Sequence, residues 1–159
     1  MFEQYLFRAI AYIMFGIVME VMFSVVGIEV LLGQTIPNRR LPKRYLEGFV
    51  SLFMIPLYLW IGFMIMEPEL EFIPLPIIIR FLAWSVCLTM WEALYGFMLD
   101  AFLGDYPWSY YALSKYKIFK RGYTLWTLVP VWGLVGLIAE WYVSLVLYLS
   151  PYVERFVNS

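Results

Sequence analysis

IIIRFLAWSVCLTMWEALYGFML, residues 77–99, contains only two charged side chains, Arg80 and Glu92. A helix of about 20 apolar residues crosses the hydrocarbon core of a bilayer, which is about 30 Å thick. This stretch meets that length with little interruption. It therefore predicts a membrane-spanning helix over Ile77–Leu99.

Three other segments of the chain reach the same length. The four expected spans are Ala9–Leu32, Gly48–Met66, Ile77–Leu99 and Gly122–Leu149. The composition agrees, because 64% of the residues are apolar and 14% are charged, against about 25% charged in a typical soluble domain. We therefore expect an all-α, polytopic membrane protein, a four-helix bundle in which residues 1–159 form a single transmembrane domain.

Composition also excludes several classes of function. The net charge is −1, whereas a nucleic-acid-binding protein is expected to carry an excess of positive charge. The absence of histidine and the single cysteine, Cys87, leave no ligand set for haem, zinc or a cysteine-rich cluster, so we expect no metal and no cofactor. Phosphate-binding loops, dinucleotide glycine patterns and hydrolase motifs are missing as well, and we expect no enzyme.

The distribution of basic residues predicts the orientation in the membrane. Lys and Arg are concentrated in the connections over residues 33–47 and 100–121, whereas the middle connection carries Glu67, Glu69 and Glu71. Loops rich in Lys and Arg stay in the cytoplasm. We therefore expect these two loops to be cytoplasmic and both termini to face outward, across the cytoplasmic membrane if the cell is prokaryotic.

Two further patterns predict local structure. The second basic connection contains an aromatic cluster, DYPWSYY at residues 105–111, which is typical of an interfacial belt at the headgroup level. Contact with a lipid headgroup or a ligand is the alternative for this cluster. Pro56 and Pro130 fall inside the second and fourth expected spans, where proline is expected to kink or locally open a helix.

The two halves of the chain share markers at equal spacings. Each half has an Arg twelve residues before a Glu, and a Gly eight residues before a Pro. The matched pairs are Arg8 with Arg80, Glu20 with Glu92, Gly48 with Gly122, Pro56 with Pro130 and Glu67 with Glu140. We expect two duplicated helical hairpins in parallel repeat, over about 5–70 and 77–149, related by a pseudo-two-fold axis along the membrane normal. Coincidence among hydrophobic segments is the alternative.

Glu20 and Glu92 fall near the middle of their expected spans, where a charge costs at least ~2.5–3.5 kcal/mol. Every Lys and Arg lies at a span end or beyond, and Arg8 and Arg80 begin about 18 Å away along the helix axis. Each carboxyl is therefore expected to be protonated, to bind a cation, to bond to polar groups such as Thr124, or to face a water-filled cavity.

Two roles remain open for this pair of carboxyl groups. A carboxylate that holds either a proton or a positively charged substrate suits a coupled carrier, and Trp91 beside Glu92 could add cation–π attraction for an organic cation. The other role is structural. In it, neutral carboxylic acids fix helix packing, helped by Gly16 one turn from Glu20, and the aromatic residues serve packing and lipid contact.

A second set of charges lies toward the outer interface. Glu67 and Glu140 end their uncharged runs at about the level where Arg8 and Arg80 begin their spans. We expect Arg–Glu pairs there, within or across the halves. Such pairs would act as a structural clasp, or alternatively as a gate.

Several motifs resemble those of a known membrane family. Gly16-Ile-Val-Met-Glu20, Arg121-Gly122-Tyr123 and Pro130-Val-Trp132-Gly133 are similar to signatures of the ABC-transporter type IV, or CmpB-like, membrane family, which includes the transmembrane protein 229 group. The resemblance runs from about Ile10 to Tyr148. It implies a polytopic protein of four helices and carries no established activity onto these residues.

The sequence thus favours a small integral membrane protein, a transporter or lipid-handling component that uses the intramembrane carboxylates Glu20 and Glu92. Its expected partners are membrane lipids, with a second copy or another membrane protein, because four helices alone enclose little volume. A non-catalytic structural or assembly subunit of a larger membrane complex is the alternative. A polar cavity that reaches both glutamates would favour the first function, and a dry bundle with a broad, flat apolar face would favour the second.

Overall fold

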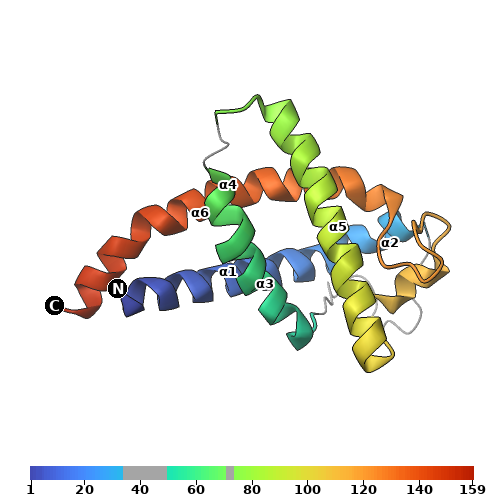
Figure 1. Cartoon of the computed structure of the whole chain (residues 1–159), viewed down its shortest axis with the longest axis horizontal. Helices are drawn as coiled ribbons and strands as arrows, with labels where there is room; N and C mark the ends of the chain where they lie inside the picture. Colours follow the sequence, from blue (N-terminus) through green and yellow to red (C-terminus); the bar gives the residue numbers. More distant parts are fainter. Residues whose placement is uncertain (34–49, 71–73) are drawn as a thin grey trace.

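The structure is a computed structural model that describes residues 1–33, 50–70 and 74–159 (Figure 1). Most of the basic connection expected over residues 33–47, together with Gly48, therefore lies outside the described residues. Within the described parts the secondary structure is helical and contains no strand beyond one isolated bridge between Lys117 and Leu125. The all-α class is what the long apolar runs predict.

Among residues 1–33, 50–70 and 74–159, four helical segments follow one another, separated by connections. The first consists of α1 (Phe2–Met22), a π-helical turn (η1, Phe23–Gly27) and α2 (Ile28–Leu32). The second consists of a 3₁₀ turn (η3, Leu52–Met54), α3 (Ile55–Ile61), a π-helical turn (η4, Gly62–Met66) and α4 (Glu67–Glu69). The third is α5 (Ile77–Leu103), and the fourth is α6 (Val129–Val157) after 3₁₀ turns η6 (Ser109–Leu113) and η7 (Trp126–Leu128).

Three of these segments are long and apolar enough to cross a membrane: Phe2–Val25, Ile77–Leu103 and Trp126–Val157. The described apolar part of the second segment is the shorter Leu52–Met66. At 1.5 Å per residue it rises about 22 Å, which is less than the bilayer core of about 30 Å. The described residues thus indicate a membrane protein, in which three helices are long and apolar enough to span a bilayer and one apolar helix is shorter.

Pro56 and Pro130 begin helices and do not bend them. Each lies in the first turn of its helix, α3 or α6, directly after a 3₁₀ turn. Proline suits this place because its missing amide hydrogen would have no intrahelical partner there. The predicted kinks are therefore wrong. The fourth helical segment also starts later than predicted, since Gly122 lies before it in a turn with a φ of 80°.

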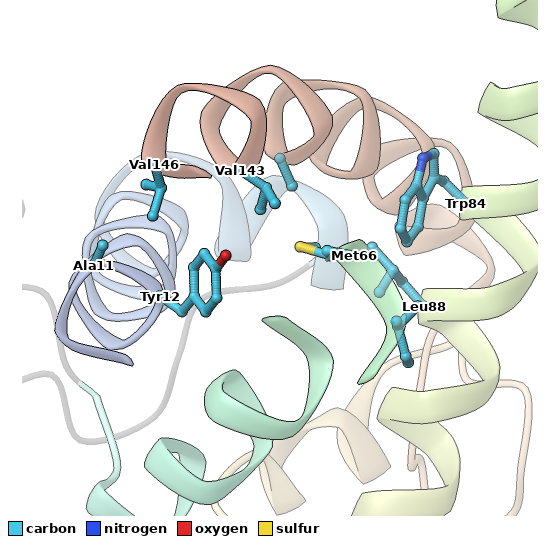
Figure 2. Close-up of a cluster of buried hydrophobic side chains, with 9 residues drawn as sticks. Ala11, Tyr12, Met66, Trp84, Leu88, Val143 and Val146 are labelled. Atoms are coloured by element: carbon cyan, nitrogen blue, oxygen red, sulfur yellow. The ribbon is translucent and has the colours of Figure 1, made fainter. Parts of the chain in front are cut away.

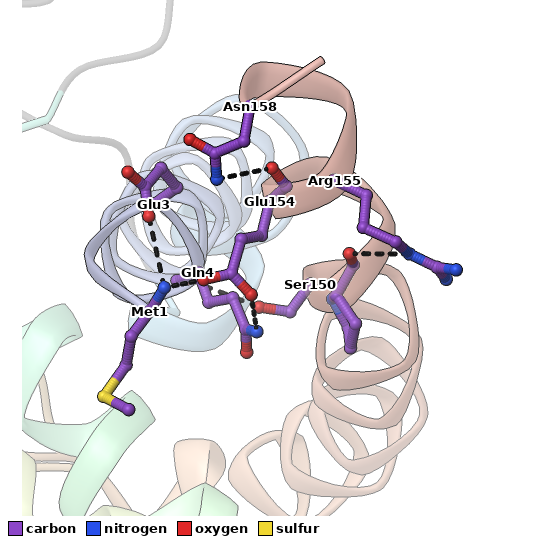
Figure 3. Close-up of polar contacts among 8 residues, drawn as sticks. Met1, Glu3, Gln4, Ser150, Glu154, Arg155 and Asn158 are labelled. Carbon is purple, nitrogen blue, oxygen red and sulfur yellow. Dashed lines mark hydrogen bonds and ion pairs between the residues drawn. The ribbon is translucent and has the colours of Figure 1, made fainter.

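Figure 1 shows how the helices are arranged relative to one another. α1 and α6 run side by side, with both chain ends at the same end of the pair, while α3 and α5 cross them. α6 packs against both α5 and α1, and α1 also packs against α3. Polar contacts join α1 to the end of α6, where Gln4 Nε2 donates to Glu154 at 2.5 Å (Figure 3).

Two buried clusters hold these elements together. The first joins all four helical segments and includes Ala11, Tyr12, Met66, Trp84, Leu88, Val143 and Val146 (Figure 2). The second cluster joins α2 to the connection between α5 and α6, and it includes Ile28, Leu32, Tyr106, Trp108, Tyr111, Leu125 and Leu128.

The aromatic cluster of this connection is buried in the protein. Tyr106, Trp108 and Tyr111 are 6%, 5% and 3% exposed. Trp108 donates to the carbonyl of Tyr123 at 2.8 Å, and Tyr106 donates to the carbonyl of Arg121 at 2.5 Å. Burial raises the pKa of Tyr106 to about 12, so this hydroxyl remains a donor at neutral pH. The interfacial belt predicted for these three residues is therefore wrong, because their polar groups are satisfied inside the protein.

Candidate functional site

A central cavity of about 360 Å³ lies between the helical segments and the 3₁₀ turn η6. Its volume falls within the range of about 300–1,000 Å³ that is usual for small-molecule sites. Both Glu20, from α1, and Glu92, from α5, line it. The cavity thus brings together two carboxyl groups that are 72 residues apart in the sequence.

The rest of the wall is mostly apolar and aromatic. No Lys or Arg occurs among the described residues that line the cavity. The aromatic hydroxyl and indole groups that line it come from α1, α3, α6 and η6, and they include Tyr12, Tyr58, Tyr110, Tyr111, Trp132 and Tyr142. The cavity therefore offers acceptor oxygens, aromatic faces and hydroxyl groups, with no basic group in the described part of its wall.

Glu92 is tightly held. It is 9% exposed, and its Oε2 accepts hydrogen bonds from Thr124 Oγ1 at 2.5 Å and from Trp132 Nε1 at 3.1 Å. The hydroxyl of Tyr111 is a further hydrogen-bond partner of this carboxyl group. Residues from three places, the bend before η7, α6 and η6, thus converge on one side chain of α5.

Glu20 has fewer partners and is partly exposed. The hydroxyl of Tyr58, from α3, donates to its Oε2, and the backbone amide of Ser51 is within reach. Gly16 lies one helical turn before Glu20, and a Cβ atom there would collide with the ring of Tyr58. The glycine therefore allows Tyr58 to lie across α1 and reach the carboxyl group.

The two carboxyl groups share a contact pattern across the halves of the chain. Tyr58 follows Pro56 by two residues, and Trp132 follows Pro130 by two residues. Each of these aromatic side chains donates to the glutamate of its own half. An aromatic residue two positions after the proline is therefore a signal that both halves of the chain share.

Tyr110 and Tyr111, in η6, interact electrostatically with both carboxyl groups. Burial foremost, and then the charges of Glu20 and Glu92, raise the pKa of Tyr110 above its usual range. Burial and then Glu92 raise the pKa of Tyr111 in the same direction. Both phenols are therefore protonated at neutral pH, and they add no negative charge to the cavity.

Arg8 and Glu67 form an ion pair away from the cavity carboxylates. Arg8 Nη1 lies 2.9 Å from Glu67 Oε2, and the hydroxyl of Tyr12 donates to Glu67 Oε1 at 2.6 Å. The guanidinium also lies over the ring of Tyr5, 4.4 Å from its centroid. This arrangement joins α1 to α4.

Arg80 and Glu140 form the corresponding pair in the second half. Arg80 Nη1 lies 2.5 Å from Glu140 Oε2, and the indole of Trp84 donates to Glu140 Oε1 at 2.7 Å. Tyr12 and Trp84 are 72 residues apart, as are Arg8 and Arg80. The pairs expected from the sequence are thus present, each within its own half, and each has a second donor that was not anticipated.

Of the remaining residues singled out in the sequence, Trp132 lines the cavity and Trp91, Pro130 and Gly133 do not. Trp91 is not among the residues that line the cavity, and its ring packs on Trp60 with the centroids 4.1 Å apart. Trp132 does line it, whereas Gly133 faces α5, where an added Cβ atom would collide with Ser85. Pro130 opens α6.

Arg121 and Gly122 shape the connection between α5 and α6. Arg121 Nε donates to Asp100 Oδ2 at 2.8 Å, and the hydroxyl of Tyr123 donates to the same oxygen at 2.7 Å. A Cβ atom on Gly122 would collide with the backbone of Tyr111. Asp100, which no sequence motif singled out, closes this connection onto the end of α5.

Fold and site together define an all-helical protein with helices suited to a membrane and a central cavity that contains two carboxyl groups. Comparisons add no relative, because no family model, curated protein or solved structure matches the chain.

Proposed function

We propose that this protein is a small multi-pass membrane transporter that binds its solute in the central cavity lined by Glu20 and Glu92. The observation that supports this most directly is that one cavity of about 360 Å³ reaches both carboxyl groups. A dry, filled bundle would have favoured a purely structural role. The chain as described has space for a solute beside the groups that can bind it.

The chemistry of the wall supports exchange between a proton and a cation. A lone carboxylate in a low-dielectric site is costly, so it must be neutralised by a proton or by a bound positive charge. No Lys or Arg among the described lining residues supplies that charge. Proton and cation then compete for the same carboxyl groups, which is the requirement for coupled transport.

The proposed architecture is a four-helix bundle built from two duplicated hairpins in parallel orientation. Its support is that equivalent contacts recur at offsets of 72 to 74 residues: Arg8–Glu67 with Arg80–Glu140, and Glu20–Tyr58 with Glu92–Trp132. On the motif resemblance alone, we also assign the chain to the CmpB-like membrane family as a proposal.

Flux in liposomes tests the transport proposal. Wild type, Glu20→Gln and Glu92→Gln are reconstituted, and proton and cation movement is followed under an imposed gradient. We expect flux from wild type and a loss of at least tenfold in both variants, because an amide at residue 20 cannot exchange a proton for a cation, and an amide at residue 92 alters the hydrogen bonds to Thr124 and Trp132 that hold the cavity wall. Equal flux from all three folded proteins, or no flux above empty liposomes, would overturn the proposal.

A structural or assembly role is the second candidate, and the exposure of α1 favours it. Large apolar side chains such as Met14, Val18 and Met22 are more than half exposed on this helix. Such a face suits lipid, a second copy or another membrane protein. Single-molecule photobleaching in native membranes would distinguish these arrangements, since a monomer that transports alone leaves this role without support.

A further inference from the structure

We propose that the cavity binds a monovalent organic ammonium ion, with Glu20 as its counter-ion and Glu92 as a positioning residue that shapes the wall. This inference rests on the proposed function, because it names the class of solute for the same cavity. It is carried by a difference between the two carboxyl groups and by the chemistry of the wall around them.

The two carboxyl groups differ in how many hydrogen bonds they already accept. Oε2 of Glu92 already accepts from Thr124 and Trp132, and Tyr111 is a third partner. A carboxylate has about four acceptor positions, so little of Glu92 is left for a ligand. Its donors come from three separate places in the chain, and this fixes those places relative to α5.

Glu20 is the more available of the two. One described side chain, Tyr58, donates to it, and Glu20 is partly exposed where Glu92 is buried. Acceptor positions on Glu20 therefore remain for a ligand that enters the cavity. One available carboxylate balances one positive charge, which is why the expected ligand is monovalent.

The wall argues for an organic ligand over a bare metal ion. Hard cations require about six oxygen ligands at close range, whereas this wall is mostly apolar and aromatic. A space of about 360 Å³ also exceeds what an alkali ion would fill. Aromatic faces beside a carboxylate are the combination that binds quaternary and alkylated ammonium groups by cation–π attraction.

The charge of the cavity excludes the other simple ligand classes. An anion would meet carboxyl groups with no Lys or Arg in the described part of the wall. The protonated phenols of Tyr110 and Tyr111 keep the wall from gaining further negative charge, so a dication is not required. A neutral apolar ligand would gain nothing from Glu20.

Equilibrium binding in detergent tests this assignment without requiring transport. The probes are benzyltrimethylammonium and neopentylbenzene, its neutral isostere in which carbon replaces nitrogen. We expect wild type to bind the cation at least tenfold more tightly than the neutral isostere. Equal affinities would overturn the proposal.

Variants then test the division between the carboxyl groups. Glu20→Gln should abolish the preference for the cation while it still binds the neutral isostere, which shows that the cavity is intact. Glu20→Asp should retain the preference. Glu92→Gln should lower the affinity for both probes but should still bind the cation more tightly than the neutral isostere. Glu3→Gln, which is on α1 like Glu20 but outside the cavity, should match wild type.

The outcomes separate this inference from the transport proposal. Loss of the preference in Glu92→Gln, with Glu20→Gln unchanged, would contradict the roles assigned here. Flux without binding of benzyltrimethylammonium would overturn the ligand class and leave transport standing. Binding with the expected preference but no flux in liposomes would support the ligand class and overturn transport.

Discussion

Single residues decide how the carboxyl groups of this protein are accommodated. Gly16 makes room for the ring of Tyr58, and the hydroxyl of Tyr58 then reaches Glu20. The same principle applies at Gly136, where an added Cβ would collide with Trp84, the indole donor to Glu140. Small residues thus place large donors against buried acceptors, because a helix face without a Cβ lets the neighbouring side chain approach.

Gly16→Ala is expected to destabilise the protein by about 1–3 kcal/mol, since the new methyl group would force Tyr58 away from α1. The measurement is thermal unfolding in detergent. Gly27→Ala is the matched control, because its Cβ would meet Leu31 Cδ1 at an ordinary distance of 3.6 Å. Equal unfolding temperatures for the two variants would contradict the close contact inferred at Gly16.

The helical elements are joined by ion pairs near their ends. Arg80 and Glu140 connect α5 to α6, and their side chains are 17% and 8% exposed. Arg8 and Glu67 connect α1 to α4, with side chains that are 12% and 19% exposed. We expect a mostly buried pair of this kind to specify which helices meet, because either charge alone would be left without compensation.

Arg80→Gln is expected to cost about 3–5 kcal/mol, because Glu140 would remain buried without its cation. The double variant Arg80→Gln with Glu140→Gln should recover part of this loss, since an amide pair carries no charge. Chemical denaturation in detergent measures both effects. Arg155→Gln, at an exposed position, is the control. An Arg80→Gln variant as stable as this control would rule out the clasp.

The whole molecule places its two chain ends together and its long connection at the opposite end. In Figure 1, α1 and α6 run in opposite directions beside each other, and the connection after α5 lies at the far end of this pair. If both helices cross the bilayer, the chain ends share one face of the membrane. The basic residues of the connection predict that this face is the outer one.

Cysteine labelling in intact cells checks that orientation. In a Cys87→Ala background, Ser159→Cys should react with a membrane-impermeant maleimide, whereas Lys120→Cys should react only after permeabilisation. The reason is that α6, which is long and apolar enough to cross a membrane, lies between the two positions. Reaction of both positions from the same face would show that α6 does not cross the membrane.

Much of the candidate site followed from local sequence. The distance of Glu20 and Glu92 from every Lys and Arg indicated that they would need other partners, and Thr124 is one of them. The aromatic donors were harder to predict. Tyr58 and Tyr111 are two among thirteen tyrosines, and spacing alone does not tell which of them turns toward a carboxyl group.

By itself the sequence determined the helical class, the suitability for a membrane and the isolation of two acidic side chains, because length and apolarity are local properties that a bilayer tests segment by segment. Only the tertiary structure decided that Pro56 and Pro130 start helices, that residues 106–111 turn inward, and that Glu20 and Glu92 share one cavity. These features depend on how helices rotate and pack against segments far away in the chain. The rotation and packing of the helices are set by how their side chains interdigitate, and the hydrophobicity of each segment does not specify them.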